Sequence, residues 1–201
     1  MESPHHFEQQ LHQLSQLFID QNSDDFSHYL EQLEFQYYTQ PVFFNQLIEL
    51  VFELLAHPLA PESDHTFDLY LFISNNFICL NLAQQQQLSV LINRHYMSYQ
   101  QPDVLRVINE IIGEKLANKS AWQLIQQLKE LSTGQHRAQI PIMLARLIQH
   151  TSSTAIKRQA ILMLQSLTHN DERLTRQQAQ QTLQRSMRLI NPRVWRSLGL
   201  S

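Results

Sequence analysis

The chain has 201 residues, of which 43% are hydrophobic. That share supports a folded core and excludes a disordered chain. Only three glycines occur, which argues against β-hairpins and phosphate-cradling loops. The formal charge of −3 and the pI near 6.3 argue against a protein that is basic throughout.

The compartment is predicted from three further features of the sequence. A single cysteine, Cys79, excludes an internal disulfide and favours a reducing, cytoplasmic setting. The polar beginning of the chain predicts no signal peptide. No run of about 18 apolar residues occurs, so we expect no membrane-spanning helix.

Helical periodicity recurs from the beginning of the chain. The first helix is predicted over residues 4–20. Ser23 is expected to cap the second, because Asp24 and Asp25 follow it in the first turn. Pro41 is typical of a helix start and predicts the third.

Residues 66–80 are ambiguous. Phe67, Leu69, Leu71 and Ile73 alternate as in a strand, yet the stretch is apolar on nearly all sides, as in a buried central helix. No second strand lies nearby in the sequence to pair with it. We therefore predict a helix.

Six more helices are predicted after this segment. They are expected to begin near Asn81, Pro102, Ser120, Pro141 and Ser153 and, for the last, to cover residues 171–190. Gly134 is predicted to end the helix that starts near Ser120. Pro141 either begins its helix or kinks it.

These elements predict an all-α fold of about ten antiparallel helices in one domain, residues 1–201, with a short tail at 191–201. About 40 residues per helix pair is typical of an α-solenoid, and an irregular helical bundle is the alternative. The stretch "SSTAIKRQAILMLQSLT" at Ser152–Thr168 resembles one helix of a HEAT or armadillo repeat. The resemblance covers residues 120–190 and implies a curved stack of helices with a binding role.

Charge is distributed unevenly along the chain. Residues 1–100 contain twelve acidic residues and one arginine, so their formal charge is −11. Residues 101–201 contain fourteen basic and six acidic residues, a charge of +8. This asymmetry between an acidic half, 1–100, and a basic half, 101–190 with its tail, suggests either an anionic partner for one end or contact between unlike ends.

The arginine-rich end is the strongest candidate for a binding surface. On the helix of residues 171–190, an apolar stripe is predicted from Ala179, Leu183, Met187 and Ile190. Arg176 falls within this stripe, which predicts a buried stem or a local ion pair. The expected partner-binding residues are Arg173, Arg185, Arg188, Arg193, Trp195 and Arg196.

Arginine makes bidentate contacts with carboxylates and phosphates. The sequence therefore predicts a non-enzymatic scaffold or adaptor that binds a protein with an acidic surface. An ordinary solvated end and a nucleic-acid-binding surface are the alternatives, and the latter lacks a recognition-helix or RNA-binding signature. The chain is expected to be a monomer or a weak homodimer.

A second candidate is the aromatic cluster in "FQYYTQPVFF". Its members are Phe35, Tyr37, Tyr38, Phe43 and Phe44. The cluster lies in the acidic half, which disfavours base stacking. It is expected to form either a packed core or a peptide-holding groove between helices.

The remaining chemical groups predict no catalysis, metal or cofactor. Ser63 and His65 are close in sequence, but a hydrolase triad is defined by geometry and not by sequence neighbours. His5 and His12 lie with Glu8 on one helix face that we expect to be solvated. Cys79 has apolar neighbours, which predicts an unreactive core thiol.

Overall fold

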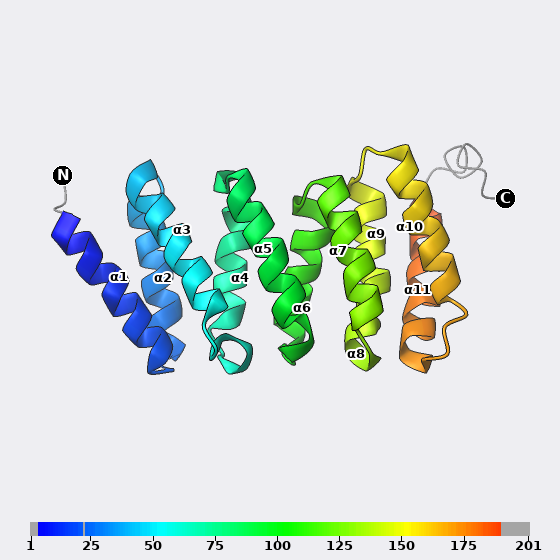
Figure 1. The fold of residues 1–201 in the computed structure, drawn as a ribbon, viewed down its shortest axis with the longest axis horizontal. Helices are drawn as coiled ribbons and strands as arrows, with labels where there is room; N and C mark the ends of the chain where they lie inside the picture. The colour runs from blue at the N-terminus through cyan, green and yellow to red at the C-terminus, as the bar shows by residue number, and fades with distance from the viewer. Residues whose placement is uncertain (1–3, 22, 190–201) are drawn as a thin grey trace. The chain divides into compact units, whose positions relative to one another are not determined.

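The computed structural model describes residues 4–21 and 23–189, and these residues are all-helical, without a strand (Figure 1). The α-helices of the first half are α1 (Pro4–Ile19), α2 (Ser23–Tyr37), α3 (Pro41–Ala56), α4 (Thr66–Asn75) and α5 (Leu82–His95). Those of the second half are α6 (Pro102–Glu110), α7 (Asn118–Leu131), α8 (Gly134–Arg137), α9 (Ile140–His150), α10 (Thr154–Leu167) and α11 (Arg173–Leu189). Short turns of other helix types are η1 (Ala60–Glu62), η2 (Phe77–Cys79), η3 (Tyr96–Ser98) and the π-helical η4 (Ile111–Lys115). The all-α prediction is confirmed.

Local sequence signals set several helix starts as predicted. Asn81 caps α5 in a capping box, because its side chain accepts from the backbone N–H of Gln84, whose own side chain accepts from the Asn81 N–H. The Ser153 hydroxyl caps α10. Pro141 lies in the first turn of α9, where its missing N–H leaves no helical hydrogen bond unmade, so it begins this helix and does not kink it.

The ambiguous segment 66–80 is helical. It forms α4 and then the single turn η2. Leu69, Tyr70 and Ile73 are completely buried, and Phe72 nearly so. The apolar character on most sides of this segment therefore reflects its burial, and the helix prediction is confirmed.

The prediction for Gly134 was wrong. Helix α7 ends at Leu131, and Gly134, with φ of +53°, begins the one-turn helix α8. The positive φ does explain the glycine. Its place is a turn between helices, which sequence alone does not distinguish from a helix terminus.

A second glycine marks a close approach between elements. A Cβ built on Gly113, in η4, would lie 2.4 Å from Cβ of Arg146 and 3.2 Å from the Met143 carbonyl oxygen, both in α9. Real Cβ atoms are almost never this close to other atoms. Glycine therefore allows the π-helical turn to pack directly on the α9 backbone.

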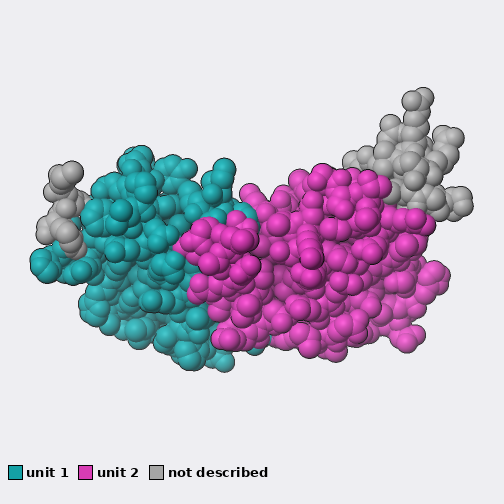
Figure 2. Space-filling model, turned by 45° about the horizontal axis from the view of Figure 1, so that its top comes forward, with its two compact units in different colours: residues 1–80, 98–104 teal, residues 81–97, 105–201 magenta. Residues whose placement is uncertain are grey.

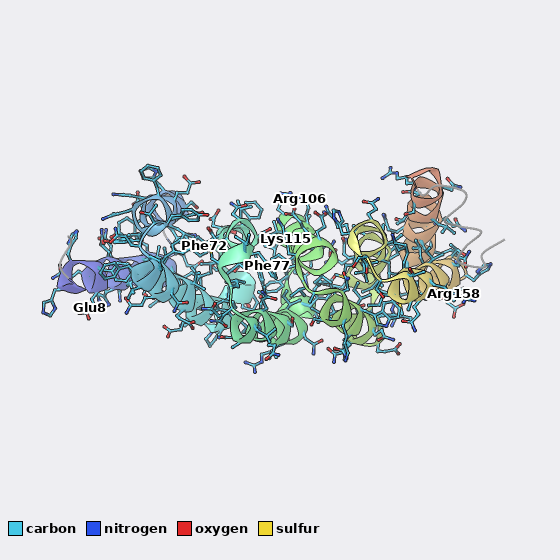
Figure 3. The ribbon with its side chains drawn as sticks, turned by 90° about the horizontal axis from the view of Figure 1, so that it is seen from above. Glu8, Phe72, Phe77, Arg106, Lys115 and Arg158 are labelled. Carbon is cyan, nitrogen blue, oxygen red and sulfur yellow. The ribbon has the colours of Figure 1, made fainter. Side chains whose placement is uncertain are left out.

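The described residues group into two compact units (Figure 2). Unit 1 consists of residues 1–80 and 98–104, and unit 2 of residues 81–97 and 105–201. Each has two helix layers: α1 and α3 against α2 and α4 in unit 1, and α5, α7 and α10 against α6, α9 and α11 in unit 2 (Figure 3). The single domain expected for residues 1–201 stays a prediction.

In unit 1, polar contacts fix the direction of the α2–α4 layer. The Ser27 hydroxyl donates to Oδ2 of Asp68 at 2.6 Å, and Nδ2 of Asn76 donates to Oε1 of Glu34 at 2.8 Å. Both residues of the second pair come later in the chain than those of the first pair, so α2 and α4 run side by side and parallel. The paired residues are 41 and 42 positions apart.

Unit 2 repeats this arrangement. Nδ2 of Asn109 donates to Oε1 of Gln139 at 2.9 Å, across 30 positions, and joins α6 to the turn before α9. Nδ2 of Asn118 contacts the Ser152 hydroxyl at 3.4 Å, across 34 positions, where α7 and α10 begin. Within each unit, a helix is thus bonded to the next helix of its own layer.

The boundary between the units also separates the charges. Unit 1 contains thirteen acidic residues and no lysine or arginine, so its formal charge is −13. Unit 2 contains all fifteen basic residues and five acidic ones, which gives +10. Among the described helices, none combines the length and apolar character needed to cross a bilayer.

Candidate functional site

The basic end of unit 2 begins at α11. Arg173 and Arg185 are exposed, and neither has an acidic partner among the described residues. The Arg188 side chain and the residues Arg193, Trp195 and Arg196 lie outside what the structure describes. Two of the six predicted partner-binding residues are thus placed on a solvent-facing helix.

A groove of about 270 Å³ lies on the surface between α9 and α11. It is lined by Ile142, Ala145, Arg146 and Gln149 of α9 and by Gln178, Thr182, Arg185 and Ser186 of α11. Arg146 is ion-paired with Glu114, which also lies 3.8 Å from Nε2 of His150. Arg185 is the cation on this groove that retains no acidic partner in the described chain, so it is available to a ligand.

The face that α11 buries differs from the predicted stripe. Ala179 is fully buried, but Leu183 is only half-buried, and the Met187 side chain and Ile190 lie outside the description. The other buried positions are polar: Thr175, Thr182 and Ser186. Small side chains allow α11 to approach α9 closely, and an analysis of hydrophobic residues alone misses them.

Arg176, which falls within the stripe, has a local role. Its guanidinium donates to the backbone carbonyls of Asn170 at 2.7 Å and Asp171 at 3.3 Å, just before α11 begins. Its side chain is half-buried. The predicted local ion pair is therefore replaced by contacts with backbone carbonyls, through which Arg176 of α11 holds the preceding loop.

The few acidic residues of unit 2 are mostly paired within it. Glu172 lies 3.4 Å from the Arg137 guanidinium and also accepts from the Thr175 hydroxyl at 3.1 Å. Glu114, Glu110 and Glu130 each lie near a basic residue as well. Basic side chains extend over both layers, with Arg106 and Lys115 on the α6–η4 side and Arg158 on α10 (Figure 3).

The aromatic cluster divides into buried and exposed members. Tyr37 and Phe44 are buried, and Phe43 is half-buried with its ring centroid 4.8 Å from that of Phe7. These three belong to the core of unit 1. Phe35 and Tyr38 are instead 90% and 55% exposed.

The two exposed aromatics border a hollow of about 510 Å³. Its lining residues are Glu31, Glu34, Phe35, Tyr38 and Thr39. An apolar hollow with acidic neighbours favours a ligand that is both apolar and cationic. Core packing is thus found for three members, while the lining of this hollow comes from residues 31–39 alone and does not form the predicted groove between helices.

The region around His65 contains no catalytic triad. The Ser63 hydroxyl accepts from the backbone N–H of His65 at 3.2 Å, so it stabilises a turn. The His65 ring is 1% exposed and stacks on Phe26 with centroids 4.3 Å apart. Both ring nitrogens lack a hydrogen-bond partner among the described residues, and burial lowers the pKa of His65 against the opposing effect of Asp68 and Asp64.

Cys79 corrects another prediction. It is exposed and not a core residue, because η2 turns the chain at this point and buries Phe77 and Leu80 instead. On α1, Nδ1 of His5 lies 3.5 Å from a Glu8 oxygen, and both side chains are mostly in solvent. Across the described positions, no group of three histidine, cysteine, aspartate or glutamate side chains is arranged to hold a metal ion.

Comparisons with known proteins assign neither a family nor a function to the chain. The resemblance to HEAT and armadillo repeats stays a prediction, since no family model, no curated protein and no solved structure matches the chain.

Proposed function

We propose that the chain is a non-enzymatic interaction module of helical-repeat type, whose basic C-terminal surface binds the acidic surface of a protein partner. The observation that carries this proposal is the division of charge between the two compact units, −13 and +10. Such a division has no role in core packing. It gives the two units opposite preferences for partners.

The helical-repeat part of the proposal is supported by the spacing of contacts. Side-chain hydrogen bonds between neighbouring helices of one layer join residues 41 and 42 positions apart in unit 1 and residues 30 and 34 positions apart in unit 2. The spacings in unit 1 fall within the length of one HEAT or armadillo repeat, about 40–47 residues, whereas those in unit 2 are shorter. Repeat proteins of this kind have regular surfaces and typically act as binding proteins.

The binding surface is supported by exposed arginines. Arg173 and Arg185 face solvent without acidic partners in the described chain, and Arg193 and Arg196 extend the same charge in the sequence. Arginine is weakly hydrated and binds carboxylates through two parallel hydrogen bonds. The single cysteine supports a reducing, cytoplasmic setting for this module.

The test is capture of partners from the native cell by the full-length chain and two charge-reversal variants. The R173E/R185E variant changes the proposed surface. The R94E/K119E variant makes the same charge change at exposed positions on α5 and α7 of unit 2. We expect an acidic protein to be lost from the first variant and retained by the second; equal retention by both would contradict the proposed surface.

A second candidate function is nucleic-acid binding, favoured by the charge of +10 on unit 2. Phosphate neutralisation makes such binding steeply salt-dependent. Fluorescence anisotropy with random-sequence DNA and RNA at low and high salt distinguishes the two functions. Absence of binding at low salt excludes this alternative.

A further inference from the structure

The exposed part of α2 carries an apolar patch that the rest of the described chain leaves in solvent. Phe35 is 90% exposed and Tyr38 55%, and Ile78 of η2 is also 90% exposed. We call these three residues the α2 patch. Aromatic and large aliphatic side chains grouped in this way are typical of an interaction site.

Contacts within unit 1 place the members of the α2 patch at one end of a layer. Asn76, at the end of α4, donates to Glu34, which precedes Phe35 in the sequence. Ile78 follows two residues after Asn76. The patch therefore lies where the parallel helices α2 and α4 both end, beside the hollow of about 510 Å³.

The rim of this hollow is acidic. Glu31 and Glu34 line it, and unit 1 contains no lysine or arginine to neutralise them. A second acidic groove, between α1 and α3, is lined by Glu8, Glu49 and Glu53. Its leucines are half-buried, and no phenylalanine, tyrosine or tryptophan lines it. Of these two acidic hollows, the one at the α2 patch thus combines exposed aromatic surface with carboxylates.

We propose that the α2 patch binds residues 190–201 of a second copy of this chain. This segment, "INPRVWRSLGLS", supplies Trp195 as an apolar anchor, flanked by Arg193 and Arg196, and has no acidic residue. Tryptophan and arginine are the residues most often responsible for binding energy at interfaces. The inference rests on the proposed function, because it identifies the acidic partner of the basic end.

A second copy is the appropriate source of the segment. The patch belongs to unit 1 and the segment to unit 2, whose formal charges are −13 and +10, so the basic end of one copy is complementary to the acidic unit of another. The contact joins two different surfaces, so it either repeats head to tail or occurs twice in a two-fold dimer.

The first experiment measures self-association of the full-length chain by sedimentation velocity over a concentration series at low salt. We expect reversible association that the Phe35→Ser substitution weakens at least tenfold, because it removes the exposed anchor without changing the core. The Val90→Ser substitution, at a side chain 56% exposed in unit 2, is the matched control. A wild-type chain that stays monomeric at all concentrations, or association that F35S leaves unchanged, would overturn the inference.

The second experiment exchanges charges between the two surfaces. An E31R chain and an R193E/R196E chain should each associate weakly alone, and their mixture should recover association. A fluorescein-labelled peptide of residues 190–201 should bind the wild-type chain and not the F35S chain. If the mixed variants do not associate, or if the peptide does not bind the wild-type chain, the inference is contradicted. If the peptide binds but the mass of the full-length chain does not rise with concentration, the segment docks within one chain, which also overturns the inference.

The two proposals can fail separately. The F35S variant leaves Arg173 and Arg185 intact, so capture of other acidic proteins should persist in it. Suppose that only the R173E/R185E variant loses capture of acidic proteins and that neither wild type nor any variant self-associates. The proposed function is then supported and this inference is wrong.

Discussion

Replacing the buried imidazole of His65 tests whether the core of unit 1 carries an acid-sensitive group. The folded chain holds this ring neutral, because burial lowers its pKa below the ordinary value of 6.5. The unfolded chain takes up a proton as pH falls through 6.5, and the folded chain does so only at lower pH. Unfolding is therefore favoured by acid, and the stability conferred by the neutral ring is lost progressively below pH 6.5.

The magnitude follows from one proton. The slope contributed by His65 has a limit of about 1.4 kcal/mol of unfolding free energy per pH unit. The His65→Phe substitution keeps a ring against Phe26 and removes both unpaired nitrogens, so we expect this slope to disappear between pH 6.5 and 5.5. A smaller slope should remain from His95, whose pKa is also lowered, mainly by burial and secondarily by Arg94.

The assay is urea unfolding followed by far-UV circular dichroism at half-unit steps from pH 7.5 to 5.5. The same substitution at the exposed His12 controls for removal of an imidazole as such. Because Phe is larger than His, the absolute stability of the variant is less informative than its pH slope. An H65F chain with the wild-type slope would refute the argument.

Three further predictions concern backbone and surface features. Gly113→Ala should lower the free energy of unfolding by about 1–3 kcal/mol, because the added Cβ would overlap Arg146. Gly134→Ala has open space around it and should lower the free energy of unfolding by about 1–2 kcal/mol through its positive φ alone. Urea titration measures both values, and a G113A chain as stable as wild type would contradict the close approach of Gly113 to α9. Asn81→Ala should lose about 1 kcal/mol by the same measurement, since it removes the capping box of α5, and an unchanged midpoint would count against that role. Cys79 should react with a thiol reagent such as DTNB in the native chain without denaturant, and protection until unfolding would show that it is buried.

Features that depend on neighbouring residues were predictable from sequence. The caps at Asn81 and Ser153 and the helix start at Pro141 rest on interactions within one turn, and the structure contains all three. The helix at 66–80 was predictable because no partner strand was available. These conclusions needed no knowledge of tertiary packing.

Features that depend on tertiary packing were not predictable. Tyr37 and Tyr38 are adjacent in an aromatic run, yet Tyr37, the last residue of α2, is buried, and Tyr38, the first residue after it, is exposed. Cys79 has apolar neighbours and is still exposed, because a single turn reverses which side chains face the core. The packing of α11 through threonine and serine needed the position of α9.

The sequence-local hydrogen bonds between helices have a consequence for how the chain acquires its structure during synthesis. Partners such as Ser27 and Asp68 are separated by about forty residues, so each emerges from a ribosome soon after the other. Loops of this length close with a small entropic cost, and low contact order accompanies rapid folding. We therefore expect the acidic unit to fold while the basic residues of the C-terminal half are still being translated, before the oppositely charged segments coexist in one unfolded chain.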